Sequence, residues 1–523
     1  MISVIDWLVV GLYVAGIVAY GLFSSRRNTS PEDYFLASRS AGWLTIGLAL
    51  IASNISSTAL VGLAGAAYAY GVSVYNYEWS AAVILVFYCI FFLPQVLTSR
   101  VYTMPEFLER RYDARARLWL ACLTLFLSVF VDGAGALYSG SIVCRMLIPT
   151  APLWVLSLAL ASLAAAYTVA GGLRAVLRTE VVQAGVLLTG AVVIAYFSFL
   201  RAGGWYEVMA SASPASLSLI RPADDPSVPW PGLVFGVPLL GFYYWCSNQV
   251  IVQRILSARN ADEGRSGALF AGLLKLPVLF LMVLPGVCAF LLFPSVGRSD
   301  LIYPTLIGAF LPHGLSGFLL AGFVVATMTA VASMLNSAST LITMDLVGPK
   351  RFLGSGQKMV SFGRLSTALC LVVSTVWAPQ IERMPSLWQY LQAVLAYAVP
   401  PVVAAFVVGL FWRRANATGA NATFLVGSLC GAVLLLVNGV LHLTHLHFLY
   451  VAPILFTIDV AILVAVSLRW PAPDKPESAG LHWSLATFRA ESARLALVPA
   501  WRNYRWQAAV LLLLTALIVW EFR

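Results

Sequence analysis

Residues 43–70 read WLTIGLALIASNISSTALVGLAGAAYAY, and the polar interruption within them decides how the rest of the chain is interpreted. The stretch is long and apolar enough to cross a bilayer as a helix, yet residues 53–58 are polar at five of six positions. Polar side chains at the centre of a membrane helix are costly unless they line a cavity or bind something, and Ser and Asn also loosen a helix by competing for its backbone hydrogen bonds. We therefore predict an unwound binding segment; close helix packing through small hydroxyl residues is the alternative.

The composition of the whole chain is that of a membrane protein. Of its 523 residues, 60% are hydrophobic and only 10% are charged, whereas a soluble domain has about 25% charged residues. The apolar residues form long runs instead of alternating with polar ones, which favours helices over a β-barrel. The sequence predicts an all-α polytopic protein of about fourteen transmembrane helices, at residues 4–23, 43–70, 75–98, 116–147, 151–169, 173–200, 230–256, 266–293, 314–346, 359–380, 386–412, 418–441, 447–468 and 506–522.

The net charge of +10 follows the predicted topology. Most of the 32 Lys and Arg residues fall in every second loop, among them Arg254 and Arg265, and such loops stay in the cytoplasm. Arg26 and Arg27 follow the first span, so this span is expected to remain as a helix and not to be cleaved as a signal. We predict a cell-membrane protein with both termini extracellular or periplasmic. The lipid bilayer accounts for the basic excess without a nucleic-acid partner.

A second interruption is predicted in the span at residues 230–256. Pro238 lies between Gly236 and Gly241, and the polar segment YWCSNQ follows at residues 244–249. Proline removes a backbone donor and frees a carbonyl in the preceding turn. The interrupted spans are the second and the seventh, the spacing expected of two inverted five-helix repeats with a binding site at their interface.

This repeat divides the chain into five parts. An extra helix and the first cytoplasmic loop are followed by the first repeat, an outer loop, the second repeat, and three C-terminal helices, at residues 1–42, 43–200, 201–229, 230–413 and 414–523. A cytoplasmic loop at residues 470–505 contains an amphipathic stretch, residues 485–497, that we expect to lie on the membrane surface.

Four charged residues fall within or at the edges of predicted spans: Glu78, Asp132, Glu180 and Lys275. Each is a functional hypothesis because a charge is expensive there, with an ion pair that only fixes packing as the alternative. Glu78 lies between Tyr77 and Trp79, which suits the hydroxyls and the apolar face of a sugar. Lys275 can donate hydrogen bonds, and Gln392 can both donate and accept them.

One face of the predicted ninth helix is polar, because Thr329, Ser333, Asn336 and Thr340 recur at helical spacing. Hard cations such as Na⁺ need oxygen ligands, and carbonyls freed in the 53–58 interruption would complete such a site. A helix packed closely through small residues is the alternative.

Nine motifs, in order along the chain, resemble the sodium:solute symporter family, and within it the sodium–glucose cotransporters. They are PEDYFLASRS (31–40), ASNI (52–55), VGLAG (61–65), YEW (77–79), TMPEFL (103–108), YTVAGGL (167–173), YWCSNQVIVQR (244–254), NSAST (336–340) and FWRR (411–414). The resemblance implies a leucine-transporter-type fold and alternating access. It also implies symport of a neutral sugar or polyol with sodium as the co-transported ion.

The resemblance also implies a set of site residues. Asn54, Glu78, Lys275 and Gln392 match the sugar-binding positions, and Tyr244 resembles an inner aromatic gate with Trp245 beside it. The sodium site would use backbone oxygens of Ala52, Ile55 and Ala326 and the hydroxyl of Thr329. Glu180 occupies the place of an Asp on the inner ion-exit route.

Three positions depart from the family pattern. Ala330 replaces the second of two adjacent hydroxyl residues at the cation site, and Ala59 replaces a His of animal glucose cotransporters. Asp132 adds a mid-span carboxylate, which makes it a candidate proton site. A proton-coupled or uncoupled sugar transporter or sensor of the same fold is therefore the alternative function. An enzyme is not expected, since no nucleophile elbow, zinc-binding helix or phosphate loop is found.

Overall fold

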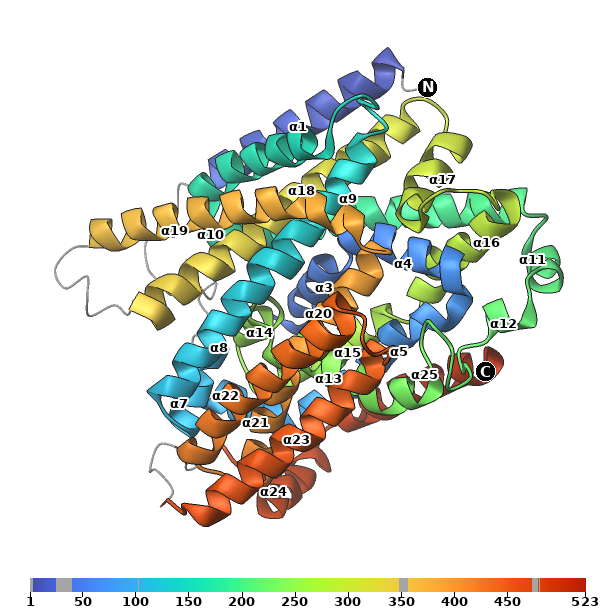
Figure 1. The fold of residues 1–523 in the computed structure, drawn as a ribbon. Coiled ribbons are helices and arrows are strands. Elements are labelled where there is room, and N and C mark those ends of the chain that lie inside the picture. Colours follow the sequence, from blue (N-terminus) through green and yellow to red (C-terminus); the bar gives the residue numbers. More distant parts are fainter. Residues whose placement is uncertain (1–2, 25–39, 102, 348–355, 473–477, 479) are drawn as a thin grey trace.

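The computed structural model describes residues 3–24, 40–101, 103–347, 356–472, 478 and 480–523. Within these ranges the chain forms helices and no strand beyond two isolated bridges (Figure 1). Eight helical stretches there are long and apolar enough to cross a membrane, or ten if each of two bent pairs counts as one span, and four apolar helices are shorter. The predicted all-α polytopic class is confirmed. The count of fourteen is not reproduced, because several predicted spans are broken or joined.

The helices up to the outer loop are α1 (Val4–Ser24), α3 (Trp43–Asn54), α4 (Ser57–Tyr70), η3 (Gly71–Tyr75), α5 (Asn76–Phe87), η4 (Tyr88–Phe92), α6 (Leu93–Thr98), α7 (Met104–Arg111), α8 (Ala114–Leu127), η5 (Ser128–Gly133), α9 (Ala134–Cys144), α10 (Leu153–Arg201), α11 (Trp205–Ser211) and α12 (Pro214–Leu217). The remaining helices are η6 (Gly232–Gly236), α13 (Val237–Phe242), η7 (Tyr243–Ser247), α14 (Gln249–Leu256), α15 (Ala261–Leu274), η8 (Leu279–Val283), α16 (Leu284–Leu292), η9 (Ser299–Leu301), α17 (Ile302–Phe310), α18 (Leu315–Thr340), η10 (Leu341–Val347), α19 (Gly356–Trp377), η12 (Ala378–Arg383), α20 (Leu387–Ala398), α21 (Pro400–Phe411), α22 (Ala417–Leu434), η13 (Leu435–Val440), α23 (Phe448–Arg469), α24 (Leu485–Leu495), η15 (Ala500–Arg502) and α25 (Tyr504–Glu521).

The interruption predicted in the second span is confirmed. Helix α3 ends at Asn54 and α4 begins at Ser57, so Ile55 and Ser56 are not helical. Ser56 is extended, and its hydroxyl accepts a hydrogen bond from the Ala59 amide at 3.3 Å, which caps the N-terminus of α4. The polar residues that break the helix therefore also start the next one.

The predicted interruption at Pro238 is wrong in position. Pro238 follows the π-helical turn η6, and the helix continues through α13 and the π-helical turn η7. A π turn accommodates the missing proline donor without ending the helix. The break falls at Asn248, whose backbone is extended and whose side chain caps α14 by accepting from the Val250 amide at 2.9 Å.

The two spans predicted at residues 151–169 and 173–200 lie in one helix, α10. A straight helix of 49 residues would be about 74 Å long, more than twice the thickness of the hydrocarbon core. Figure 1 shows its first part beside α1 and its last part running away toward α11. The boundary that hydropathy predicted between residues 169 and 173 therefore does not coincide with a helix end.

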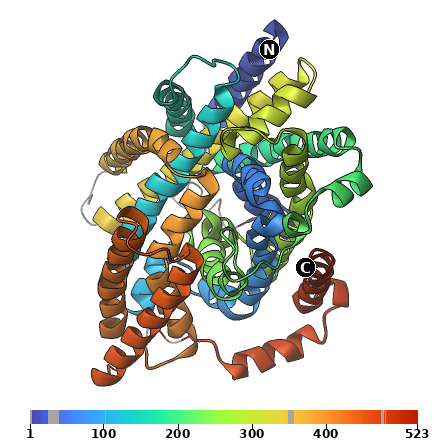
Figure 2. The same ribbon diagram turned by 45° about the vertical axis from the view of Figure 1, so that its right-hand side comes forward.

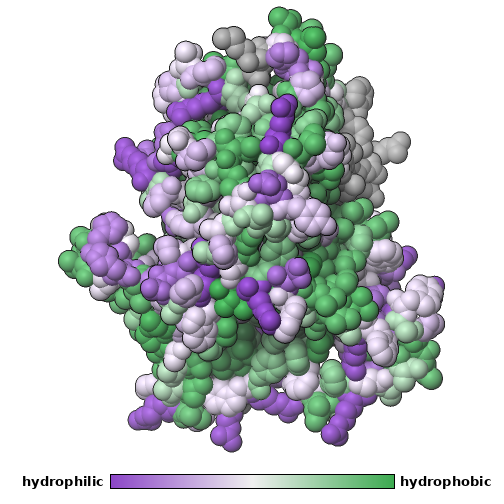
Figure 3. Space-filling model, turned by 90° about the vertical axis from the view of Figure 1, so that its right-hand side faces the viewer, coloured by the Kyte–Doolittle hydropathy of each residue, from purple (hydrophilic) through white to green (hydrophobic). Residues whose placement is uncertain are grey.

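The outer surface and the C-terminal helices agree with a protein embedded in lipid. Figure 3 shows hydrophobic residues over much of the lower middle and right of one face, with hydrophilic residues along the lower edge, on the left side and in the upper part. The amphipathic stretch predicted after residue 485 is confirmed as helix α24. Figure 2 shows α24 crossing one end of the bundle from the α22–α23 side to α25, which carries the C-terminus. Its contact with a membrane surface stays a prediction.

Candidate functional site

A cavity of about 210 Å³ lies where the two helix breaks meet. It is bordered by the ends of α3 and α14, by α5, α18 and α20, and by the π-helical turns η5 and η7. Every predicted site residue except Glu180 lines it: Ala52, Asn54, Ile55, Glu78, Asp132, Tyr244, Trp245, Lys275, Ala326, Thr329 and Gln392. Glu180 lies in α10, and its side chain is outside the described residues.

A hydrogen-bonded chain connects four of these residues. The ammonium of Lys275 donates to Glu78 Oε2 and to Asn54 Oδ1, and Asn54 Nδ2 donates to the Tyr244 hydroxyl at 3.1 Å. Lys275 is 1% exposed and lies 5.5 Å from the centre of the Trp245 ring, within the range of a cation–π interaction. The network joins α3, α5, η7 and the end of α15 at one point.

Local structure explains why Lys275 points into the cavity. Lys275 is the C-cap of α15, where the helix ends in a turn at residues 275–277 before η8 begins. The hydroxyl of the fully buried Tyr75 donates to the carbonyl of Leu276 in this turn at 3.0 Å. Glu78 lies in the first turn of α5, directly after Tyr75. One short segment therefore holds both the carboxylate and the turn that carries its partner.

Aromatic side chains of α5 and α20 also line the cavity. Gln392 lines the cavity from α20, and Trp388 lies one turn before it on the same helix. The rings of Tyr77 and Trp388 pack edge to face at 5.6 Å. The Tyr77 hydroxyl and the Trp388 indole nitrogen are buried and have no hydrogen-bond partner among the described residues. Sequence reasoning missed Trp388, although its spacing of four from Gln392 was a usable signal.

The oxygen atoms near the first break fit a hard cation. The Thr329 hydroxyl lines the cavity, is 3% exposed as a residue, and has no partner in the described part of the chain. Within the same part, the carbonyls of Ala52 and Ile55 accept no hydrogen bond across the break. Free carbonyl and hydroxyl oxygens are the ligands Na⁺ requires. Ala330 also lines the cavity, so an apolar methyl group stands where a second hydroxyl was expected.

Two further charged residues line the cavity. Asp132 is half-buried in the π-helical turn η5 and lies within hydrogen-bonding reach of the Asn248 side chain. Arg254 is 3% exposed in α14, and its guanidinium donates to Ser333 Oγ at 3.3 Å. The prediction that Arg254 lies in a cytoplasmic loop is therefore wrong. Helix α14 continues to Leu256, and the charge is buried against α18.

Known proteins match both the sequence and the fold. The sequence pattern of the sodium:solute symporter family matches residues 34–427. Sodium/myo-inositol cotransporter 2 of Oryctolagus cuniculus is 34% identical over 95% of this chain and 81% of its own length. Sodium/glucose cotransporter 4 of Danio rerio is 33% identical over 90% and 80%, and sodium/glucose cotransporter 1 of Oryctolagus cuniculus is 32% identical over 93% and 82%.

Two solved structures share the fold at low sequence identity. A Na⁺-coupled sialic acid symporter in a substrate-bound outward-open state has a TM-score of 0.77 at 21% identity, covering 90% of this chain and 99% of its own. The nucleobase-cation-symport-1 family transporter Mhp1, in a closed conformation, has a TM-score of 0.56 at 16% identity, covering 87% and 99%. The resemblance inferred from the nine motifs is confirmed: the chain belongs to the sodium:solute symporter family and is a sodium-coupled membrane transporter, not an enzyme.

Proposed function

We propose that this protein takes up a neutral sugar or related polyol across the cell membrane. Uptake is driven by a sodium gradient and proceeds by alternating access. The observation that carries the proposal is the network of Lys275, Glu78 and Asn54 in the cavity. Its two opposite charges cancel, yet it offers both donors and acceptors, as a neutral polyhydroxyl solute requires. The aromatic rings beside it suit the C–H face of a sugar ring.

The roles of the individual residues follow from this chemistry. Asn54, Glu78, Lys275 and Gln392 bind the hydroxyls of the solute. Tyr244 closes one side of the site, with Trp245 beside it. Relatives that are named sodium/glucose and sodium/myo-inositol cotransporters support a sugar or cyclic polyol as the substrate class.

Sodium would bind at the break between α3 and α4. The backbone oxygens of Ala52, Ile55 and Ala326 and the hydroxyl of Thr329 supply oxygen ligands there, and Glu180 lies on the route by which the ion leaves. Because the carbonyls at the break also belong to the segment that presents Asn54, a bound cation would hold the solute site in shape. This linkage is the physical basis for coupling the two binding events.

A finer description of the fold belongs to the same proposal. The two five-helix repeats span residues 43–200 and 230–413, about fourteen helices cross the membrane, and both termini lie outside. Two observations support it: the breaks after Asn54 and at Asn248 meet at one cavity, and the Na⁺-coupled sialic acid symporter shares the fold. The loop charges support the orientation.

Uptake into proteoliposomes tests the function. Purified protein is supplied with labelled glucose or myo-inositol, with an inward sodium gradient or with choline in its place. We expect at least one of the two solutes to accumulate above its external concentration only with sodium. Equilibration without accumulation under the sodium gradient would contradict sodium-driven uptake.

A second candidate is a proton-coupled or uncoupled transporter or sensor, and Asp132 and Ala330 favour it. Asp132 adds a carboxylate to the cavity, and Ala330 removes a possible sodium ligand. The same vesicles with a pH gradient and no sodium separate the cases. Accumulation that is lost in Asp132→Asn would assign proton coupling, and binding without any accumulation would assign a sensor or facilitator.

A further inference from the structure

Helices α5 and α15 run antiparallel and are tied together at two points. At the cavity, Lys275 at the end of α15 pairs with Glu78 at the start of α5. Arg265 lies ten residues before Lys275, about 15 Å away along the helix. Its Nε donates to the Cys89 carbonyl, just beyond α5, at 3.1 Å. The second tie therefore joins the same two helices at their other ends.

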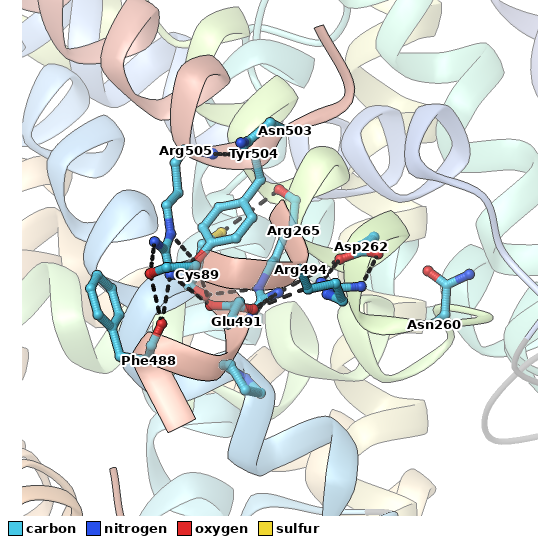
Figure 4. Close-up of polar contacts among 12 residues, drawn as sticks. Cys89, Asn260, Asp262, Arg265, Phe488, Glu491, Arg494, Asn503, Tyr504 and Arg505 are labelled. Atoms are coloured by element: carbon cyan, nitrogen blue, oxygen red, sulfur yellow. Dashed lines mark hydrogen bonds and ion pairs between the residues drawn. The ribbon is translucent and has the colours of Figure 1, made fainter. Parts of the chain in front are cut away.

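The C-terminal helices α24 and α25 contact Arg265, which forms the second of these two links. Arg265 is 2% exposed, and its Nη1 also forms an ion pair with Glu491 of α24. Its guanidinium lies 4.4 Å from the centre of the Tyr504 ring at the start of α25. Figure 4 shows these groups converging on Arg265 from α24 and α25. The prediction that Arg265 lies in a cytoplasmic loop is therefore wrong: the residue is buried in helix α15 and paired by a helix outside the predicted repeats.

Glu491 is the centre of this arrangement. Its carboxylate accepts from the Tyr504 hydroxyl at 2.9 Å and from Arg505 Nη2 at 3.2 Å, in addition to pairing with Arg265. Arg505 further donates to Ser492 Oγ at 2.6 Å and to the Phe488 carbonyl at 3.3 Å, both in α24. The corner between α24 and α25 is therefore held by several contacts and presents one carboxylate to α15 (Figure 4).

We propose that α24 is a clamp that fixes α15 against α5, and that Arg265 and Glu491 are positioning residues for the Lys275–Glu78 pair. The proposal rests on the proposed function in that it treats this pair as part of the solute site. Neither Arg265 nor Glu491 lines the cavity. They act through helix placement, because a shift of α15 against α5 moves the Lys275 ammonium away from the Glu78 carboxylate.

A neighbouring ion pair supplies a matched control. Arg494 of α24 binds both oxygens of Asp262 at 2.8 Å, at the start of the same helix α15. Both side chains of this pair are about half exposed, at 51% and 53%, whereas the Arg265 side chain is 3% exposed. Exposed pairs contribute little, but removing Glu491 takes away the nearer carboxylate of a buried guanidinium and leaves it only Asp262, at 3.6 Å. The two pairs join the same two helices and differ in burial. They contact each other only at longer range, since Arg494 lies 3.8 Å from Glu491 and Asp262 lies 3.6 Å from Arg265.

The test compares Glu491→Gln, Glu491→Asp and Arg494→Gln in the full-length protein in proteoliposomes. We expect Glu491→Gln to raise the KM for glucose or myo-inositol by about five- to tenfold with less effect on kcat, as for mutations that weaken coupling between sites. Arg494→Gln should change the KM by less than about twofold. Glu491→Asp keeps the carboxylate and should restore most of the affinity.

Hydrogen exchange of the same proteins gives a readout that needs no solute. Glu491→Gln should speed exchange at residues 273–278, the end of α15 and its turn, and leave α22 and α23 unchanged. Equal effects of Glu491→Gln and Arg494→Gln, or faster exchange throughout the protein, would overturn the clamp. If the wild type transports no sugar, the proposed function fails, while the exchange result still decides whether α24 holds α15.

Discussion

Lys275 and Glu78 stand 197 residues apart in the chain, and the Lys275 ammonium donates directly to Glu78 Oε2 at the wall of the cavity. Both residues are buried, at 1% and 5% exposure. Asn54, at the end of the broken helix α3, shares the same ammonium. A solute that binds this network therefore contacts residues of the first helix break and of the α5–α15 pair at the same time.

Replacing Glu78 with glutamine is expected to abolish measurable solute binding. The variant removes the acceptor charge and leaves the Lys275 ammonium buried without its partner, which costs about 3–5 kcal/mol of stability. The double variant Glu78→Gln/Lys275→Met removes both charges, so it should recover thermal stability but not binding. Calorimetric titration with glucose and myo-inositol, beside a thermal melt, measures the two effects. Wild-type affinity in Glu78→Gln would remove this pair from the solute site.

Thr329 and Ala330 are expected to change sodium affinity in opposite directions. Thr329→Val keeps the shape of the side chain but removes the unpartnered hydroxyl, and should raise the sodium concentration for half-maximal uptake by about tenfold or more. Ala330→Ser adds an oxygen next to it in the cavity and should lower that concentration. Sodium titrations of solute uptake measure both variants. An unchanged half-saturation in both would exclude a sodium site at this position.

Asp132 is expected to exclude anionic solutes. Its carboxylate lines the cavity, and like charges repel more strongly in a poorly hydrated site than in water. Asp132→Asn should therefore let glucuronate compete with the transported sugar, whereas Asp132→Glu should not. Inhibition of labelled-sugar uptake by glucuronate, at constant pH and sodium, is the measurement. Equal inhibition of the wild type and Asp132→Asn would show that Asp132 does not select for charge.

The docking of the loop at residues 222–230 against His447 is expected to weaken at acidic pH. Its Nε2 donates to the Pro226 carbonyl and its Nδ1 accepts from the Leu449 amide, both at 3.2 Å, so the bound ring is neutral. Burial lowers the pKa of His447 below its ordinary value of about 6.5. The stabilisation is therefore complete above about pH 6.5 and is lost as the pH falls through the lowered pKa.

Hydrogen exchange at residues 222–230, compared between pH 5 and pH 7.5 after correction for intrinsic rates, measures this effect. His447→Gln should remove the pH dependence of loop protection. His445→Gln is the matched control, since His445 is exposed two residues before His447. This variant should behave as the wild type. Loop protection that is independent of pH in the wild type would contradict the role of His447.

The first helix break and the residues around it were predictable from the sequence. Five polar residues within six, inside an apolar run, carry a local desolvation cost that can be recognised from the sequence alone. The break after Asn54 was therefore expected and is observed. The family resemblance then indicated ten residues that do line one cavity, and the mid-span charge of Asp132 indicated an eleventh. The substrate and ion roles of those residues stay predictions.

The sequence by itself determined the membrane class, the family and the place of the first break, because hydropathy, motifs and the cost of buried polar groups are sums over neighbouring residues. Only the tertiary structure decided that the second break falls at Asn248 and not at Pro238, since packing allows a π turn before the proline. The burial of Arg254 and the clamp between Arg265 and Glu491 also belong to the tertiary structure. Arg265 and Glu491 are far apart in the chain and meet only through helix packing. No local pattern of residues predicts such a contact.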